Sequence, residues 1–140
     1  MTVGIAGEHF IAYNLARRGI NPALMNAGAR AVDILATIDG STVVSIQVKA
    51  SWARQAPRQW IVGRHKPSPS PNFFYAFCNI WEDLRLDPEV FIVPSLFVFE
   101  SVNWESSVPL FKITPDTEKR FKAAASEDDG WSLITQCLGI

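Results

Sequence analysis

The sequence predicts an α/β (α+β) fold in which a central mixed sheet is flanked by helices. Three observations predict it: an amphipathic segment near the N-terminus, two β-branched segments joined by a turn, and a C-terminal part with the patterns of further strands and helices. The chain has 140 residues, of which 48% are hydrophobic and 19% are charged. This length and composition suit one globular domain over residues 1–140.

The first predicted element is a helix over residues 5–18. Gly19 ends it, because glycine readily adopts the left-handed conformation found after helices. The Asn21-Pro22 pair prevents the helix from continuing, since proline has no backbone N–H to donate. A short extended piece is expected near 23–26.

Several later segments have the composition of β-strands. They are rich in β-branched or aromatic residues and are bounded by turn residues: 31–38, 42–49, 58–63, 73–80 and 90–93. The first two are joined by Asp39-Gly40, a frequent hairpin turn. The proline-rich run from Lys66 to Pro71 predicts an extended loop between the third and fourth strands.

Helices are expected in the C-terminal part of the chain. The run SLFVFESV after Pro94 suits strand or helix by propensity, and we favour a short helix. Thr114-Pro115 is a typical helix start and predicts a helix through about Ala125. A last helix is expected over residues 131–138.

The register of the hairpin follows from which side chains must share a face. Side chains alternate between the two faces of a strand, so the apolar residues of both strands must lie on the same face. A three-residue turn with Gly40 in the left-handed conformation meets this condition, because it pairs Ile34 with Ile46. The same register pairs Asp33 with Gln47.

Four polar side chains are predicted to converge at this hairpin. In this register Asp33 lies about 5 Å from Gln47 between Cβ atoms, and Lys49 lies diagonally on the same face at about 7 to 8 Å. Glu8 falls in the middle of an apolar helix stripe, where a buried carboxylate requires a cation as its partner. That stripe is formed by Ile5, Ile11, Ala12, Leu15 and Ala16.

Such a cluster suits a divalent metal ion. The donors are the carboxylates of Asp33 and Glu8, the amide oxygen of Gln47 and the backbone carbonyl of Val48. These are the oxygen ligands that Mg²⁺ or Mn²⁺ prefers. A bound metal lowers the pKa of its water, and Lys49 would position that water or stabilise the transition state. The pattern predicts phosphodiester hydrolysis, with catalytic residues Asp33, Gln47, Lys49 and Glu8.

Three motifs make the sequence similar to a known family. Gly7-Glu8 opens a helix that ends in ARRG, VDIL follows at 32–35, and IQVK follows at 46–49. Over residues 4–50 the chain resembles the PD-(D/E)XK nuclease superfamily. It is most similar to the branch with QxK, which includes Holliday-junction-resolvase-like proteins and a group I intron homing endonuclease. The resemblance implies a restriction-endonuclease-like αβββαβ core and a magnesium-dependent DNA endonuclease.

The resemblance also assigns roles to single residues. It makes Asp33 the metal-binding first acid and Gln47 the residue at the second-acid position. Lys49 becomes the motif lysine, and Glu8 the helical carboxylate. The chain departs from the motif at Val32, where the name has proline, and at Gln47, which is neutral. The neutral side chain leaves open a catalytically inactive nucleic-acid-binding module on the same fold.

Charge is distributed unevenly along the chain. Residues 1–81 carry a net charge of +5 and residues 82–140 a net charge of -6, and there is no acid between Asp39 and Glu82. This asymmetry predicts a surface that faces a polyanion. The basic residues expected to contact nucleic acid are Arg54, Arg58, Arg64 and Lys66.

The expected partner is nucleic acid, with DNA favoured over RNA by the resemblance. Nucleases of this fold often act as dimers, so a homodimer is possible by analogy. The N-terminus lacks a signal-peptide pattern and no segment approaches the length of a membrane span, which predicts a cytoplasmic protein without a membrane partner. A protein-interaction domain is a further possibility, motivated by the 11% aromatic content and the acidic C-terminal part.

Overall fold

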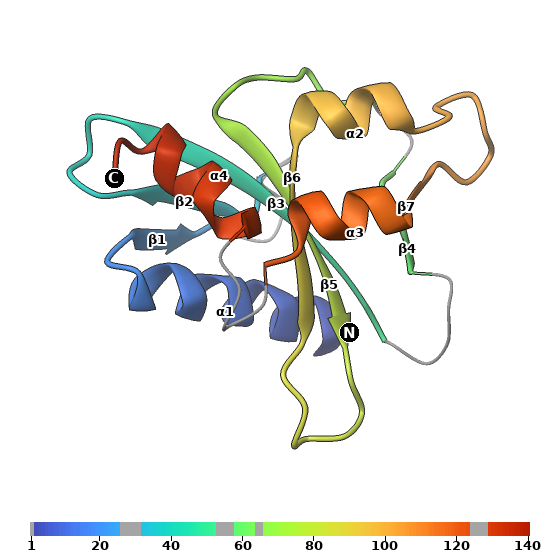
Figure 1. Ribbon diagram of the computed structural model, residues 1–140, viewed down its shortest axis with the longest axis horizontal. Coiled ribbons are helices and arrows are strands. Elements are labelled where there is room, and N and C mark those ends of the chain that lie inside the picture. The colour runs from blue at the N-terminus through green and yellow to red at the C-terminus, as the bar shows by residue number, and fades with distance from the viewer. Residues whose placement is uncertain (1, 26–31, 53–57, 64–65, 124–128) are drawn as a thin grey trace.

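Among the described residues a helix comes first, a series of strands follows, and helices with one further strand make up the C-terminal part, as predicted for a mixed fold (Figure 1). The computed structural model describes residues 2–25, 32–52, 58–63, 66–123 and 129–140. Within these residues the elements are α1 Thr2–Arg17, β1 Asn21–Leu24, β2 Ile34–Thr37, β3 Val43–Trp52, β4 Gln59–Ile61, β5 Phe73–Ile80, β6 Glu89–Pro94, α2 Ser95–Ser101, β7 Leu110–Lys112, α3 Pro115–Phe121 and α4 Asp129–Cys137.

The described strands form a five-stranded sheet and a two-stranded ribbon. The order in the large sheet is β1-β2-β3-β5-β6, with β3 and β5 parallel and the other neighbours antiparallel. The predicted mixed sheet flanked by helices is therefore confirmed. The ribbon pairs β4 with β7. β7 has no counterpart among the predicted strands, because three residues are too few for alternation to be recognised.

The β2–β3 hairpin has the predicted register. Ile34 pairs with Ile46, and Gly40 has a φ of 83°, in the left-handed region. The connection is tied by the Thr37 hydroxyl, which donates to the Thr42 carbonyl at 2.6 Å and accepts from the Gly40 N–H at 2.9 Å. The apolar sets of both strands consequently share one face, as the sequence requires.

The two faces of the large sheet are covered differently. On one face, α1 and α4 share a buried core with residues from β2, β3, β5 and β6. On the other face, α2, α3 and the β4–β7 ribbon form a second core with β5 and β6 only. The second face of β3 is therefore bordered by this layer and remains partly exposed along Ser45, Gln47, Lys49 and Ser51.

The buried face of α1 differs from the predicted stripe. Ile5 is 58% exposed and Ala16 is also exposed, whereas Glu8 is half-buried at the edge of the buried face. The prediction was wrong at these two apolar positions because the close packing of Gly7 against side chains of β3, and not the size of the apolar side chains on the helix, sets which face of α1 is buried. The residues buried on the helix are Val3, Gly7, Ile11, Asn14 and Leu15.

Gly7 is where α1 meets the sheet. A Cβ atom added there would lie 2.8 Å from Ala50 Cβ and 3.3 Å from Val48 Cγ1, both on β3. A contact of 2.8 Å between carbon atoms is well inside their optimal separation. Because glycine has no side chain, α1 can pack closely against β3 at Gly7. This close packing also sets the position of the neighbouring Glu8.

Gly7→Ala is expected to destabilise the fold by about 1–3 kcal/mol, because the added methyl group overpacks the contact with Ala50. The matched control is Gly4→Ala, where an added Cβ meets nothing within 4 Å. Removing a helical glycine there is expected to leave stability unchanged or to raise it by up to about 1 kcal/mol. Chemical denaturation measures both, and equal effects of the two variants would contradict the close contact.

The C-terminal helices follow the prediction except at one end. α2 is the short helix favoured after Pro94, and α3 begins with the Thr114 cap. α3 ends at Phe121 and not near residue 125, because Lys122 turns extended and pairs with Phe91 of β6. Sheet pairing thus interrupts a segment with good helix formers.

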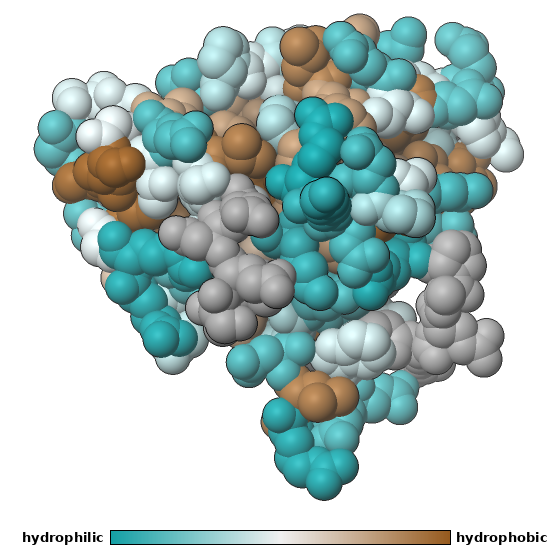
Figure 2. Space-filling view, viewed as in Figure 1, coloured by the Kyte–Doolittle hydropathy of each residue, from teal (hydrophilic) through white to brown (hydrophobic). Residues whose placement is uncertain are grey.

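The surface seen in Figure 2 is mixed, with hydrophobic residues in separate patches among hydrophilic ones. None of the helices in the described ranges is long and apolar enough to cross a membrane.

Candidate active site at the open edge of strand β3

Asp33 lies where β2 and β3 separate. The Asp33 N–H donates to the Ile46 carbonyl at 2.9 Å, which is the last backbone bond of that pairing. The next N–H on this edge, that of Val48, donates to Asp33 Oδ2 at 2.8 Å. The Asp33 carboxylate therefore accepts a hydrogen bond that the carbonyl of a neighbouring strand would otherwise accept. The Val48 N–H in turn holds this carboxylate in position.

The carbonyl of Val48 faces the same edge. The N–H and C=O of one strand residue point to the same side of the strand, and the Val48 N–H points to Asp33. The Val48 carbonyl oxygen is thus on the side of the strand where Asp33 lies. This atom is the backbone ligand expected for a metal ion from the sequence, and its direction suits that role.

Glu8 reaches the same edge from α1. Its pKa is raised above the ordinary value by burial, by the negative charge of Asp33 and by a hydrogen bond shared with Asp33. Two carboxyl groups from different elements are therefore close enough to compete for one proton. The convergence of Glu8 and Asp33 is as the sequence predicted; their catalytic role remains a prediction.

Glu8→Gln is expected to stabilise the metal-free protein at pH 7 to 8. A raised pKa means that the folded state binds the proton more tightly, so stability is full below the ordinary pKa of 4.5 and is lost as pH rises through the folded-state value. Glutamine does not ionise as the pH rises, so no second negative charge forms beside Asp33. The variant should therefore lose less stability than wild type as the pH rises above 4.5. Thermal unfolding in EDTA between pH 4 and 8 measures this, with the exposed Glu100→Gln as control. Parallel pH profiles for Glu8→Gln and wild type would refute the repulsion.

Gln47 and Lys49 lie on the partly exposed face of β3. Alternation places them opposite Ile46, which is buried under α1. Lys49 is half-buried, and burial lowers its pKa while the negative charge of Asp33 acts in the opposite direction. The lysine therefore lies in the electric field of Asp33, and three of the four predicted side chains are electrostatically linked.

The neighbour of Gln47 on β5 is an aromatic residue that the sequence analysis did not select. Tyr75 pairs with Gln47 in the parallel register and is almost fully buried. Burial raises the pKa of its phenol to about 12, so it stays protonated at neutral pH. Only the strand pairing reveals this neighbour, because the two residues are far apart in the sequence.

Two hollows lie along the polar face of β3. One is bounded by Lys49 and Ser51 on β3 and by Gln59, Ile61, Val108 and Leu110 around the ribbon. The other is bounded by Val32 and Ser45 near the start of the site and by the segment from Lys66 to Phe73. Together they follow β3 from Ser45 to Ser51, about 20 Å at the usual rise per residue.

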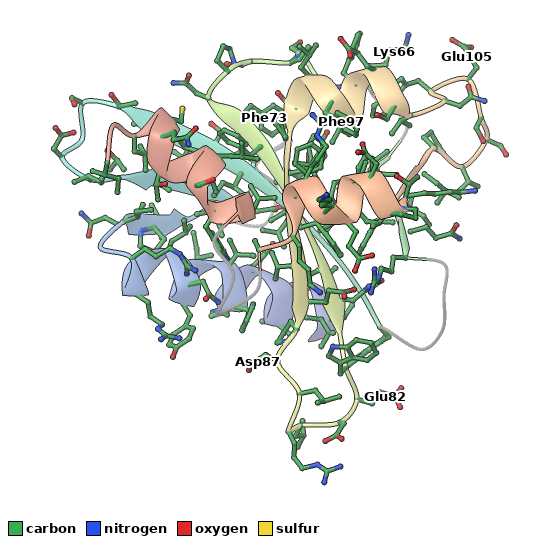
Figure 3. All side chains as sticks on the ribbon, in the orientation of Figure 1. Lys66, Phe73, Glu82, Asp87, Phe97 and Glu105 are labelled. Atoms are coloured by element: carbon green, nitrogen blue, oxygen red, sulfur yellow. The ribbon has the colours of Figure 1, made fainter. Side chains whose placement is uncertain are left out.

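The predicted nucleic-acid contacts have different surroundings. Lys66 is exposed, borders the second hollow and points outward (Figure 3). Arg58 is held by Glu89 and Glu118, each at 2.8 Å, and lies over the Phe91 ring at 5.7 Å. Its guanidinium is thus neutralised within the fold. The other two predicted contacts, Arg54 and Arg64, lie outside the described residues.

The donors at the β3 edge fit a hard cation. The oxygens available are those of Asp33 and Glu8, the Gln47 amide and the Val48 carbonyl, and oxygen ligands suit Mg²⁺ or Mn²⁺. A cation between the two carboxylates would offset the repulsion that raises the pKa of Glu8. Among the described residues no three His, Cys, Asp or Glu side chains are placed to hold a metal ion together, so a third side-chain donor here would be neutral.

Fold and site together define the protein class. A helix carrying a carboxylate, an antiparallel hairpin with an acid where its strands separate, and a parallel β3–β5 pair make the restriction-endonuclease-like fold. The fold class predicted from the sequence is therefore confirmed.

Similarity to a solved homing endonuclease supports this fold. The chain is similar to the bacterial homing endonuclease I-Ssp6803I, with a TM-score of 0.63, 16% identity, and coverage of 96% of this chain and 89% of that one. A second match is Hjc, a Holliday junction resolvase from the archaeal hyperthermophile Archaeoglobus fulgidus, with a TM-score of 0.48, 14% identity, and coverage of 84% and 88%. No family model and no curated protein matches the sequence.

Proposed function

We propose that this chain is a metal-dependent DNA endonuclease that hydrolyses phosphodiester bonds at the open edge of β3. The observation that carries the proposal is the convergence of Glu8, Asp33 and Lys49 at that edge, within a fold shared with a homing endonuclease. Two neighbouring carboxylates without a lysine beside them occur in many folds. This pair lies near a lysine on a partly exposed sheet face, where a hollow beside the lysine could admit a phosphate.

The residues have distinct roles in this proposal. Asp33, Glu8, the Gln47 amide and the Val48 carbonyl hold Mg²⁺ or Mn²⁺. When bound, the metal neutralises phosphate charge and lowers the pKa of a water molecule. Asp33 is suited to its role because the Val48 N–H fixes its carboxylate before any ligand arrives.

Lys49 acts on the substrate directly. Its ammonium group donates hydrogen bonds to a non-bridging phosphate oxygen or to the attacking water. Its half-buried position strengthens those bonds, because charge interacts more strongly where water is excluded. Charge developing on the phosphate in the transition state is thereby stabilised.

The nucleic acid would lie along the polar face of β3. Lys66 borders the hollow at one end of this face, next to Val32, and supports a phosphate contact near the reacting bond. DNA is preferred to RNA because a solved structure with a similar fold is a homing endonuclease. A homodimer would supply two such sites, one for each strand of a duplex.

A non-catalytic binding module is the second candidate function. Gln47 favours it, because a neutral amide contributes less metal affinity than a carboxylate does. Binding would then use the same face of β3, and DNA would remain intact in any divalent metal.

Plasmid nicking in Mg²⁺ or Mn²⁺ tests the proposal. Wild type should nick the plasmid, EDTA should stop the reaction, and Lys49→Ala should reduce the rate by about 100-fold or more. Lys119→Ala, which removes an exposed lysine from α3, is the matched control and should retain the rate. Wild type that binds DNA without cutting it in either metal would instead support the binding module.

A further inference from the structure

The β4–β7 ribbon has one buried and one outward face. Trp60 and Phe111 pair across it and are 2% and 1% exposed, and the Trp60 indole N–H donates to the Cys78 carbonyl at 3.0 Å. Alternation turns the flanking residues outward, as two cross-strand pairs: Gln59 with Lys112, and Ile61 with Leu110. Polar and aliphatic groups thus lie side by side on a narrow surface.

This outward face of the ribbon lies next to the candidate active site. Gln59, Ile61 and Leu110 border the same hollow as Lys49. Lys112 is exposed, and Ile61 is 62% exposed although it neighbours a buried tryptophan. A ligand whose phosphate meets Lys49 would therefore extend over the ribbon.

The side chains on the ribbon favour base edges over base faces. Single-stranded nucleic acid is usually bound by stacking on exposed aromatic rings. The aromatic residues of the ribbon, Trp60 and Phe111, face the core and cannot serve in this way. Glutamine and lysine instead match adenine and guanine edges, and aliphatic groups match the thymine methyl group, all in the major groove.

We propose that the outward face of the β4–β7 ribbon reads base pairs in the major groove of duplex DNA, beside the phosphate held at Lys49. The major groove admits a two-stranded ribbon. This inference rests on the proposed function, because it takes Lys49 as the phosphate contact. On this inference, Gln59, Ile61 and Lys112 determine which base pairs the protein prefers.

Two of the acidic residues near the ribbon have cationic partners. Glu118 is paired with Arg58 at 2.8 Å, and Asp116 lies 3.7 Å from Arg120. Glu105 points outward from the connection between α2 and β7 (Figure 3). Lys49 supplies positive charge where the backbone of the duplex would pass, and the exposed Lys112 stays available to a base edge.

The experiment is a selection from a randomised duplex library in Ca²⁺ in place of Mg²⁺, followed by sequencing of the bound DNA. Wild type should enrich a defined sequence. Gln59→Ala and Lys112→Ala should each relax the preference at one or two base pairs by about tenfold, and Ile61→Ala should do so at a thymine. Lys119→Ala should enrich the wild-type sequence, and thermal unfolding confirms that all variants are folded.

Several results would overturn the inference. These are enrichment of the wild-type sequence by all three ribbon variants, no enrichment by wild type, and tighter binding of single strands than of duplex. Plasmid nicking decides the proposed function separately. If wild type shows a sequence preference but does not nick DNA, the ribbon still reads base pairs and the proposed nuclease activity is wrong. If wild type nicks DNA without any sequence preference, the nuclease activity holds and the role of the ribbon is wrong.

Discussion

Asp33→Asn is expected to lower metal-dependent cleavage by at least about 100-fold while the protein stays folded. Asparagine keeps an oxygen that can accept the Val48 N–H, which now donates to Asp33 Oδ2 at 2.8 Å. It removes the negative charge that a divalent cation requires at this edge. Loss of activity would thus follow from charge and not from a broken strand edge.

Asp33→Ala separates the two roles of the carboxylate. It removes the charge and also leaves the Val48 N–H without its acceptor, which is expected to cost about 1–3 kcal/mol of stability. Nicking rates, calorimetric titration with Mn²⁺ and thermal unfolding together distinguish the two variants. Asp39→Asn is the control, because that carboxylate accepts hydrogen bonds from Ser41 in the exposed hairpin turn. If the Asp33→Asn protein cuts DNA within tenfold of the wild-type rate, Asp33 is not a metal ligand.

Arg58→Met is expected to destabilise the fold by about 2–4 kcal/mol. The side chain of Glu89 is only 10% exposed, and it accepts from Arg58 at 2.8 Å and from Asn79 at 3.0 Å. Without the guanidinium, a nearly buried carboxylate loses its cation. The value lies below that of a fully buried pair because the Arg58 side chain is 34% exposed.

Two further variants test the origin of this effect. Glu89→Leu in the Arg58→Met background should recover part of the lost stability, because the nearly buried carboxylate is gone and the remaining partner, Glu118, is 36% exposed. Arg85→Met, at an exposed ion pair with Asp83, should change stability little. A stable Arg58→Met protein that binds DNA weakly would instead show that Arg58 contacts nucleic acid, as predicted from the sequence.

The hairpin and its polar residues could be predicted because their determinants are local. Two strands joined by a short turn have few registers, and only one places both apolar sets on the same face. The register places Asp33 beside Gln47 and thereby near Lys49. Composition and turn residues likewise predicted α2 after Pro94 and the start of α3 at Thr114.

The ribbon and the ion-pair network could not be predicted, because their partners are distant in the chain. β4 pairs with β7 across about 50 residues, and Arg58 meets Glu89 and Glu118 only after β6 and α3 have packed. A run of basic residues in a sequence looks the same whether carboxylates or phosphates neutralise it. The same limitation applied to Ile5 on α1, whose exposure follows from the approach of Gly7 to β3.

The sequence by itself determined the fold class, the hairpin register and the residues of the candidate site, since alternation and turn chemistry act between neighbours. Tertiary structure alone decided which face of β3 stays uncovered, which basic residues remain for a ligand, and that a ribbon stands beside Lys49. The physical reason is that burial and ion pairing depend on what packs opposite a residue, and that partner comes from elsewhere in the chain.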